Sequence, residues 1–165
     1  MRVYVPATTV QLRELDASGQ LGTAPITAFA VTPALREWYV DDDVEALEYA
    51  AMMEAARASL RLVDADAAAA RRRVVVAGEV ADREVSVRDD LDRGVVQVAI
   101  PIALADVASV HVDDREAETA VSAAAEAIAA ADLGDETAQD TVDDVEGFEL
   151  SWYASQEIGP LLELL

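Results

Sequence analysis

The residues best suited to chemistry in this sequence lie in segment 107–114, which reads Val-Ala-Ser-Val-His-Val-Asp-Asp. It holds His111, the one histidine of the chain, and ends in the carboxylates of Asp113 and Asp114. An imidazole beside carboxylates can act as a general base, or it can join carboxylate oxygens in binding a divalent cation. With Glu157 as a fourth candidate, one hypothesis is a divalent-cation-dependent enzyme whose catalytic residues are His111 and these carboxylates.

The same residues also have a structural interpretation. Alternation along a strand places His111 and Asp113 on one face and their valine neighbours on the other, and a single strand histidine is commonly a hydrogen-bonded structural residue. Asp113 or Asp114 can cap the helix expected after them. If His111 faces outward beside Asp113, and within reach of Glu157 or Asp106, the surrounding negative charge predicts a raised histidine pKa.

Two charge runs carry alternatives of their own. The three aspartates at 41–43 can offer oxygen ligands to a divalent cation, or they can cap a helix and face its positive end, which we expect. The three arginines at 71–73 can receive an anion, or they can pair with neighbouring acids, which we also expect. The sequence contains no serine in a nucleophile elbow and no glycine-rich phosphate loop. It therefore predicts no cofactor, and no residue is assigned outright as a metal ligand.

The composition restricts the classes of function. The chain has 165 residues with 33 acidic and 12 basic side chains, a net charge of −21, and no lysine, asparagine or cysteine. Without cysteine there is no disulfide, thiolate nucleophile or cysteine-type zinc site. So much negative charge repels nucleic acid and anionic membranes and favours a basic protein partner, although adaptation to high salt would give a similar surface.

The hydropathy pattern points to the cytoplasm. No apolar run approaches the ~18 residues of a membrane span. The apolar run at the start of the sequence is too short for a signal peptide. We therefore expect a cytoplasmic protein.

The elements that must position the candidate residues follow from periodicity. Wide apolar stripes at helical spacing predict core-facing helices at 43–63 and 115–131, and shorter helices follow Thr8 or Thr9 and Thr32-Pro33. Runs rich in β-branched residues predict strands near 2–5, 26–31, 73–80, 85–87, 95–102, 107–112 and 148–154. Together they predict a single α+β domain over 1–165, with two or three helices packed on a mixed or mainly antiparallel sheet.

Two segments near the end bear on partners. Residues 132–147 hold seven acids and no base, which predicts a mobile acidic loop. Trp152 and Tyr153 follow it, and they are the candidate partner-binding residues because aromatic side chains often anchor interfaces. Strand alternation offers the other interpretation, with one ring in the core and the other half exposed.

Four blocks carry a family resemblance. Segments 1–8, 28–36, 110–114 and 152–158 begin Met-Arg-Val-Tyr-Val-Pro, Ala-Phe-Ala-Val-Thr-Pro, Val-His-Val-Asp-Asp and Trp-Tyr-Ala-Ser-Gln-Glu-Ile. In these blocks the chain resembles an uncharacterised family of short acidic actinobacterial proteins, a domain of unknown function. The resemblance implies where the sequence comes from and implies no mechanism. The favoured hypothesis is thus a non-catalytic accessory or protein-interaction module with an acidic surface, and the alternative is the cation-dependent enzyme.

Overall fold

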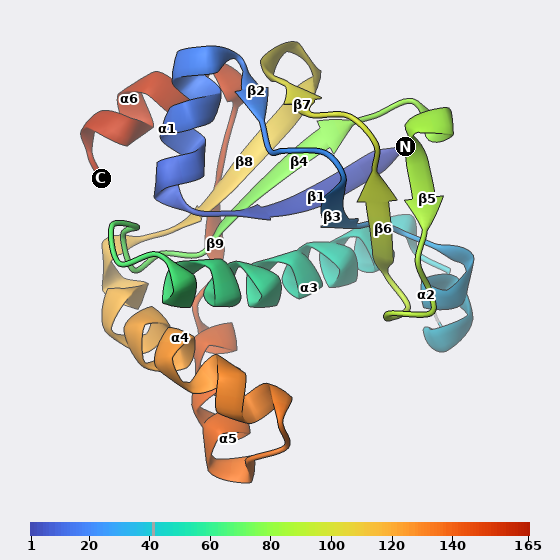
Figure 1. Ribbon diagram of the computed structural model, residues 1–165. Coiled ribbons are helices and arrows are strands. Elements are labelled where there is room, and N and C mark those ends of the chain that lie inside the picture. Colours follow the sequence, from blue (N-terminus) through green and yellow to red (C-terminus); the bar gives the residue numbers. More distant parts are fainter. Residues whose placement is uncertain (41) are drawn as a thin grey trace.

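A computed structural model describes residues 1–40 and 42–165 of the chain. Within these residues, seven strands form one antiparallel sheet in the order β5-β6-β3-β1-β4-β8-β9 (Figure 1). They are β1 Arg2–Ala7, β3 Ile26–Phe29, β4 Val74–Glu79, β5 Val85–Val87, β6 Val95–Val98, β8 Val107–Asp113 and β9 Leu150–Tyr153. A separate pair consists of β2 Gln20–Leu21 and β7 Ile102–Ala103. The predicted single α+β domain with a mainly antiparallel sheet is confirmed.

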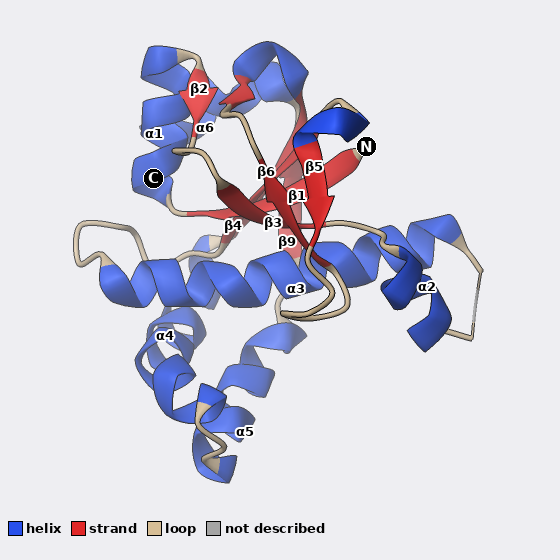
Figure 2. Cartoon of the chain, turned by 45° about the vertical axis from the view of Figure 1, so that its right-hand side comes forward, coloured by secondary structure: helices blue, strands red, loops and turns tan. Residues whose placement is uncertain are grey.

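The helices pack around this sheet in layers. They are α1 Thr9–Ser18, α2 Pro33–Trp38, α3 Val44–Ala65, α4 Glu118–Asp132, α5 Glu136–Asp144 and α6 Ile158–Glu163. Helix α3 runs along the sheet, α1 and α6 lie beside each other, and α4 and α5 extend beyond α3 on the side away from the strands (Figure 1 and Figure 2). In the described part of the chain, no helix is long and apolar enough to cross a membrane.

The two faces of the sheet have different apolar covers. On one face, Leu12 and Leu15 of α1 pack with Ile158 of α6 and with valines of the central strands. On the other face, the fully buried Ala51 and Ala55 of α3 pack against the strands. Because alanine is short, this wide α3 stripe lets the helix lie close to the sheet. The predicted core-facing role of the helix is thereby confirmed.

Helix α3 is also tied to the sheet by a buried hydroxyl. Ser59 Oγ donates to the carbonyl oxygen of Ala7 at 2.7 Å and accepts from the backbone N–H of Val74 at 3.1 Å. One side chain thus satisfies buried backbone groups of both β1 and β4. It fixes the height of α3 over the centre of the sheet.

Helices α1 and α2 begin as their sequences predict. Thr8 accepts from the backbone N–H of Gln11 while the Gln11 side chain accepts from Thr8 N–H, which forms a capping box. Gly19 ends α1 in the left-handed conformation, with φ of 79°. Thr32 caps α2 ahead of Pro33. These caps fix where the two helices stand beside β1 and β3.

The acidic loop predicted at 132–147 is wrong in its secondary structure. Asp135 accepts from the backbone N–H of Ala138 and caps α5. Ala138 and Val142, four residues apart, are buried in the cluster formed by α4 and Leu60. A narrow apolar stripe therefore outweighs the like charges, which remain on the solvent side. The expected mobility of this segment stays a prediction that hydrogen exchange across α5 can check.

The strand predicted at 95–102 is divided. Strand β6 ends at Val98, and Ile102 belongs to β7, where it pairs with Leu21. Pro101 lies between them and has no N–H to donate to a ladder, so the run cannot continue in one sheet.

Candidate functional site

His111 lies on β8, which stands between β4 and β9 in the sheet. The strand register places it between Val75 of β4 and Trp152 of β9, and its Nε2 is 3.0 Å from Ser109 Oγ. Its pKa is lowered, because burial disfavours the charged imidazolium and the nearby positive charge of Arg2 adds to this effect. The predicted upward shift is therefore wrong. A hydrogen-bonded, half-buried histidine agrees with the structural interpretation.

Asp113 is part of a buried ion pair. Arg73 donates from Nε to Asp113 Oδ2 and from Nη2 to Asp113 Oδ1, each at 2.8 Å, and its backbone N–H adds a third bond to Oδ2. The guanidinium also donates to the carbonyl oxygen of Phe148 at 2.8 Å. Both side chains are almost inaccessible to solvent, at 2% and 0%. This clamp joins the start of β4, the end of β8 and the chain that enters β9. Both carboxylate oxygens of Asp113 are bonded to Arg73 and shielded from solvent.

Asp114 and Glu157 also have local partners. Ser151 Oγ donates to Asp114 Oδ1 at 2.8 Å, and the backbone N–H of Ala154 donates to Glu157 Oε2 at 2.7 Å. The described residues contain no group of three or more histidines and acids that could hold a metal ion. The structure thus does not bring His111 and the three carboxylates together as one metal centre.

The two charge runs are used as helix caps and ion pairs. Asp43 accepts from the N–H of Glu45 and caps α3, as expected, whereas Asp41 lies outside the described residues. Arg72 pairs with Glu118 at 2.8 Å, and Arg73 pairs with Asp113. Arg71, the first arginine of the run, departs from the expectation, because it donates to the carbonyl oxygens of Val63 and Asp66.

The candidate partner-binding pair is split by strand alternation. On the edge strand β9, Trp152 is 61% exposed. Tyr153 is half-buried and packs against the core. Trp152 is therefore the one of the two that could meet a partner with most of its ring.

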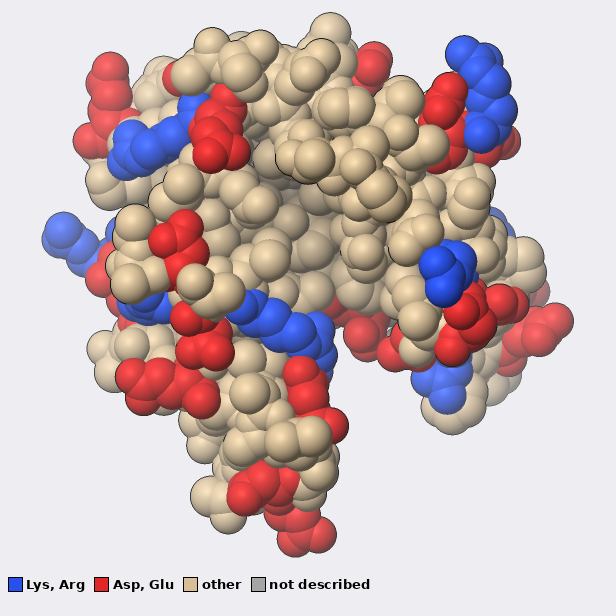
Figure 3. Space-filling model, viewed as in Figure 1, with Lys and Arg blue, Asp and Glu red and all other residues tan. Residues whose placement is uncertain are grey.

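The sheet opens between β1 and β3, and a cleft lies there. Strand β1 pairs with β4 along its whole length, but it pairs with β3 at Tyr4 and Phe29. The cleft has a volume of about 420 Å³, within the range of ligand sites. Its walls come from β1, α1, the segment from β2 into β3, and α3, and they include Val5, Pro6, Leu21, Pro25, Ile26, Phe29, Ala58 and Leu62. Figure 3 shows the centre of this side of the molecule as a hollowed area without charged side chains.

Two further hollows continue the cleft. At one end, Phe29 is shared with a small pocket of about 100 Å³ that also contains Trp38, Tyr39, Glu54, Asp92 and Arg93. At the other end, Gln11, Gly22 and Thr23 are shared with a hollow of about 450 Å³ along α1. We call the three together the groove. Helix α3 contributes Glu54, Ala58, Arg61 and Leu62 to it, at the spacing of one helix face.

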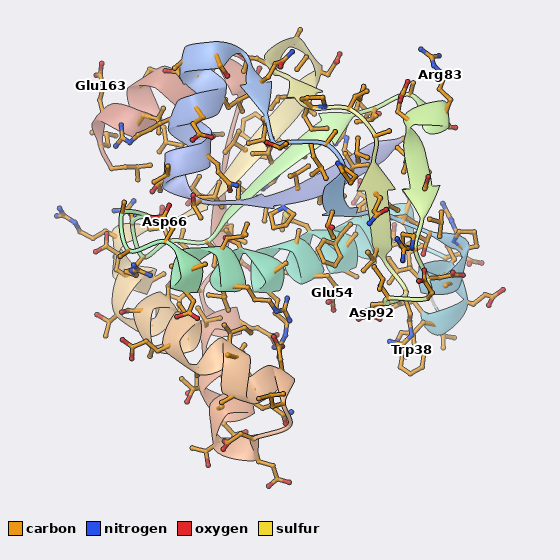
Figure 4. The ribbon with its side chains drawn as sticks, in the orientation of Figure 1. Trp38, Glu54, Asp66, Arg83, Asp92 and Glu163 are labelled. Carbon is orange, nitrogen blue, oxygen red and sulfur yellow. The ribbon has the colours of Figure 1, made fainter. Side chains whose placement is uncertain are left out.

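Charge is distributed unevenly along the groove. Glu54 and Asp92 stand at the Trp38 end (Figure 4), and Glu14 lies in the hollow at the other end. The charged residue of the central cleft is Arg61, whose guanidinium is held by Asp132 through bonds of 2.7 and 2.8 Å. Counting Arg93 at the Trp38 end, the groove has a net negative charge at both ends, and its middle is apolar apart from Arg61, whose charge is balanced by Asp132.

The sequence does not reveal the groove, because the walls of its central cleft are mostly ordinary apolar residues scattered from Val5 to Leu62. The one local signal is Pro6, which cannot donate a ladder hydrogen bond and so favours a sheet border that is left open. A proline within β1 indicates that one side of this strand is partly unpaired, but it does not identify the strand on that side.

Comparison with known proteins gives a family and no activity. The model of a family of unknown function, DUF6912, matches residues 1–162. No curated protein and no solved structure matches the chain. The resemblance to a domain of unknown function is confirmed, while the actinobacterial origin stays an expectation. Because the match covers nearly the whole chain, the protein belongs to the family of unknown function DUF6912.

Proposed function

We propose that this protein is a non-catalytic interaction module that binds an extended segment of a partner protein in the groove. The observation that carries the proposal is the opening of the sheet between β1 and β3, where Tyr4 and Phe29 pair and the strands then separate around a cleft of about 420 Å³. Three hollows in a row that share their walls suit a chain segment better than one compact ligand.

The hydrogen bonds of the predicted catalytic residues favour an interaction module over the cation-dependent enzyme. Asp113 is held by Arg73, Asp114 accepts from Ser151, and Glu157 accepts from a backbone N–H. A general base or a metal ligand needs a free lone pair directed at substrate or ion. Both oxygens of Asp113 are taken up by Arg73, and one oxygen each of Asp114 and Glu157 holds a strand or turn in place.

Charge supports a basic partner. The net charge of −21 steers cationic surfaces toward the protein and repels a phosphate backbone, so a nucleic-acid partner is not part of the proposal. The acidic ends and apolar middle of the groove match a segment with an apolar centre and basic flanks. A cytoplasmic location belongs to the same proposal, and cell fractionation can check it.

Trp152 is a second candidate anchor for the same kind of partner. It is 61% exposed on an edge strand, where unpaired backbone groups can accept another strand. Tyr153, which packs against the core, would contribute to this surface only at its rim.

The proposal can be tested by selection of random linear peptides displayed on phage against the intact protein. Thr27 is exposed on β3 and lines the cleft, so Thr27→Trp fills the space without disturbing the core. Ser86 lies in the same row of the sheet two strands away, since both residues flank Gln97, and Ser86→Trp is therefore the matched control.

Selected peptides should carry apolar residues between basic ones. We expect Thr27→Trp to weaken their binding at least about tenfold, whereas Ser86→Trp leaves it unchanged. Peptides that bind both variants equally well would place the binding surface elsewhere. Loss of binding in Trp152→Ser alone would move it to β9.

A further inference from the structure

We infer that the pocket at the Trp38 end of the groove binds the guanidinium group of an arginine side chain. The inference concerns the pocket whose walls include Trp38 and Tyr39, the acids Glu54 and Asp92, and Arg93, which is already stacked on Trp38. Its extension to a partner's arginine rests on the proposed function. The pocket has a volume of about 100 Å³, which suits a flat group of a few heavy atoms.

Aromatic walls favour a planar cation here. Trp38 already carries a guanidinium on its ring, because the central carbon of Arg93 lies 3.3 Å from the ring centroid. The Trp38 side chain is nevertheless 61% exposed, and Tyr39 is 43% exposed, so aromatic surface remains open for a second cation. Arginine stacks on such rings and spreads its donors in one plane, whereas lysine presents a compact ammonium.

The two carboxylates are available for such a cation. Among the described residues, Glu54 has no hydrogen-bond or ion-pair partner, and Asp92 accepts only from the backbone N–H of Arg93 at 2.7 Å. Several other arginines take acids as partners, for example Arg61 with Asp132 and Arg2 with Glu79. In this pocket, Arg93 stacks on Trp38 instead and forms no ion pair with either carboxylate, while Arg57 and Arg61 act on Glu54 only through charge at longer range.

The environment of Glu54 agrees with this assignment. Its pKa is raised, first because surrounding protein desolvates the carboxyl and second because Asp92 repels its negative charge. Arg57 and Arg61 oppose this rise in part, and Glu146 adds a little to it. Figure 4 shows Glu54, Asp92 and Trp38, which come from three separate elements, along one side of the molecule. A cation placed between the two acids would favour the charged form of Glu54. Binding should therefore strengthen as the pH rises through the pKa of Glu54, and below that pKa it should release a proton.

The first test uses ethylguanidinium as the probe and the full chain, with the Trp38 indole N–H followed by NMR. We expect a saturable shift in the wild type that Glu54→Gln and Asp92→Asn each weaken about tenfold, the scale of one charge-assisted bond. Glu163→Gln is the control, because Glu163 lies on α6 far from the pocket (Figure 4). A shift that does not saturate, or one that survives the double variant, would overturn the inference.

The second test separates this inference from the proposed function. A groove-binding peptide is compared with its copy in which citrulline, a neutral isostere, replaces each arginine in turn. We expect one position to lose about tenfold in affinity, and Glu54→Gln with Asp92→Asn to abolish that difference. If the citrulline peptides bind as well as the arginine peptide at every position while Thr27→Trp still blocks binding, the proposed groove is supported and the arginine pocket is contradicted. If ethylguanidinium binds but Thr27→Trp weakens the binding of no peptide, the arginine pocket is supported and the proposed function is contradicted.

Discussion

Strand β1 has β4 on one side and β3 on the other, and the two borders are built differently. Toward β4, it is paired from Arg2 to Ala7, and the sheet continues through β8, where Arg73 and Asp113 form their buried clamp. Toward β3, the strands pair at Phe29 and then separate around the cleft. The residues with the most conspicuous chemistry thus stabilise the closed side, and the open side is made of common apolar residues.

The largest effect should come from breaking the clamp on the closed side. Asp113→Ala leaves the guanidinium of Arg73 buried without its counter-charge, so we expect a loss of about 3–5 kcal/mol in the free energy of unfolding. Urea titration followed by circular dichroism measures this. Asp90→Asn, which removes an exposed ion pair with Arg88, should leave the midpoint unchanged.

A double variant sharpens the assignment of the clamp. Arg73→Met with Asp113→Leu replaces the pair by apolar side chains of similar size and should recover most of the stability. A double variant as unstable as Asp113→Ala would show that the bonds from Arg73 to the backbone, rather than the ion pair, carry the stabilisation.

A smaller effect is expected where α3 is held on the closed border between β1 and β4. Ser59→Ala removes the bond to the Ala7 carbonyl and leaves the N–H of Val74 without its acceptor, which should cost about 1–3 kcal/mol. Ser18→Ala on α1 removes hydroxyl bonds that are exposed to solvent and serves as the control. Equal stability of the two variants would contradict a role for Ser59 in holding α3 on the sheet.

The sequence predicts the parts of this molecule that local patterns determine. The apolar stripe of α3, the capping threonines Thr8 and Thr32 and the alternation in β8 are all visible in short windows. The sequence does not predict helix α5, because its apolar stripe consists of only Ala138 and Val142 among seven acids. These two residues become buried only when they pack against α4.

The candidate site is harder to predict, because it depends on which distant residues share a wall. From the sequence alone, Asp113 and His111 look like catalytic residues, because their partners in the fold are not known. The structure shows that Asp113 bonds to Arg73 and His111 to Ser109, which gives both residues a structural role. Glu54 is the reverse case. Along the sequence it is one helical acid among many, and only the fold brings Asp92 beside it.

The pH dependence of His111 gives a still smaller and gradual effect. Because its pKa is lowered in the folded state, the unfolded chain binds a proton more readily than the folded chain does. Its contribution to stability is therefore complete above the ordinary histidine value of about 6.5 and is lost as the pH falls toward the folded-state pKa. An NMR titration of His111 should give a midpoint below that value that magnesium and manganese leave unchanged. An ion-dependent shift would restore the cation-dependent enzyme.

The smallest effect on folding should come from Trp152, which lies at the far edge of the closed side. Since its ring is 61% exposed, Trp152→Ser should change the free energy of unfolding by no more than about 0.5 kcal/mol. This makes the variant a clean test of where partners bind, because any loss of affinity cannot come from unfolding. If the groove is the docking surface, peptides selected on the wild type should bind Trp152→Ser unchanged and fail on Thr27→Trp. The opposite pattern would show that the edge of the closed side, and not the gap beside β1, receives the partner.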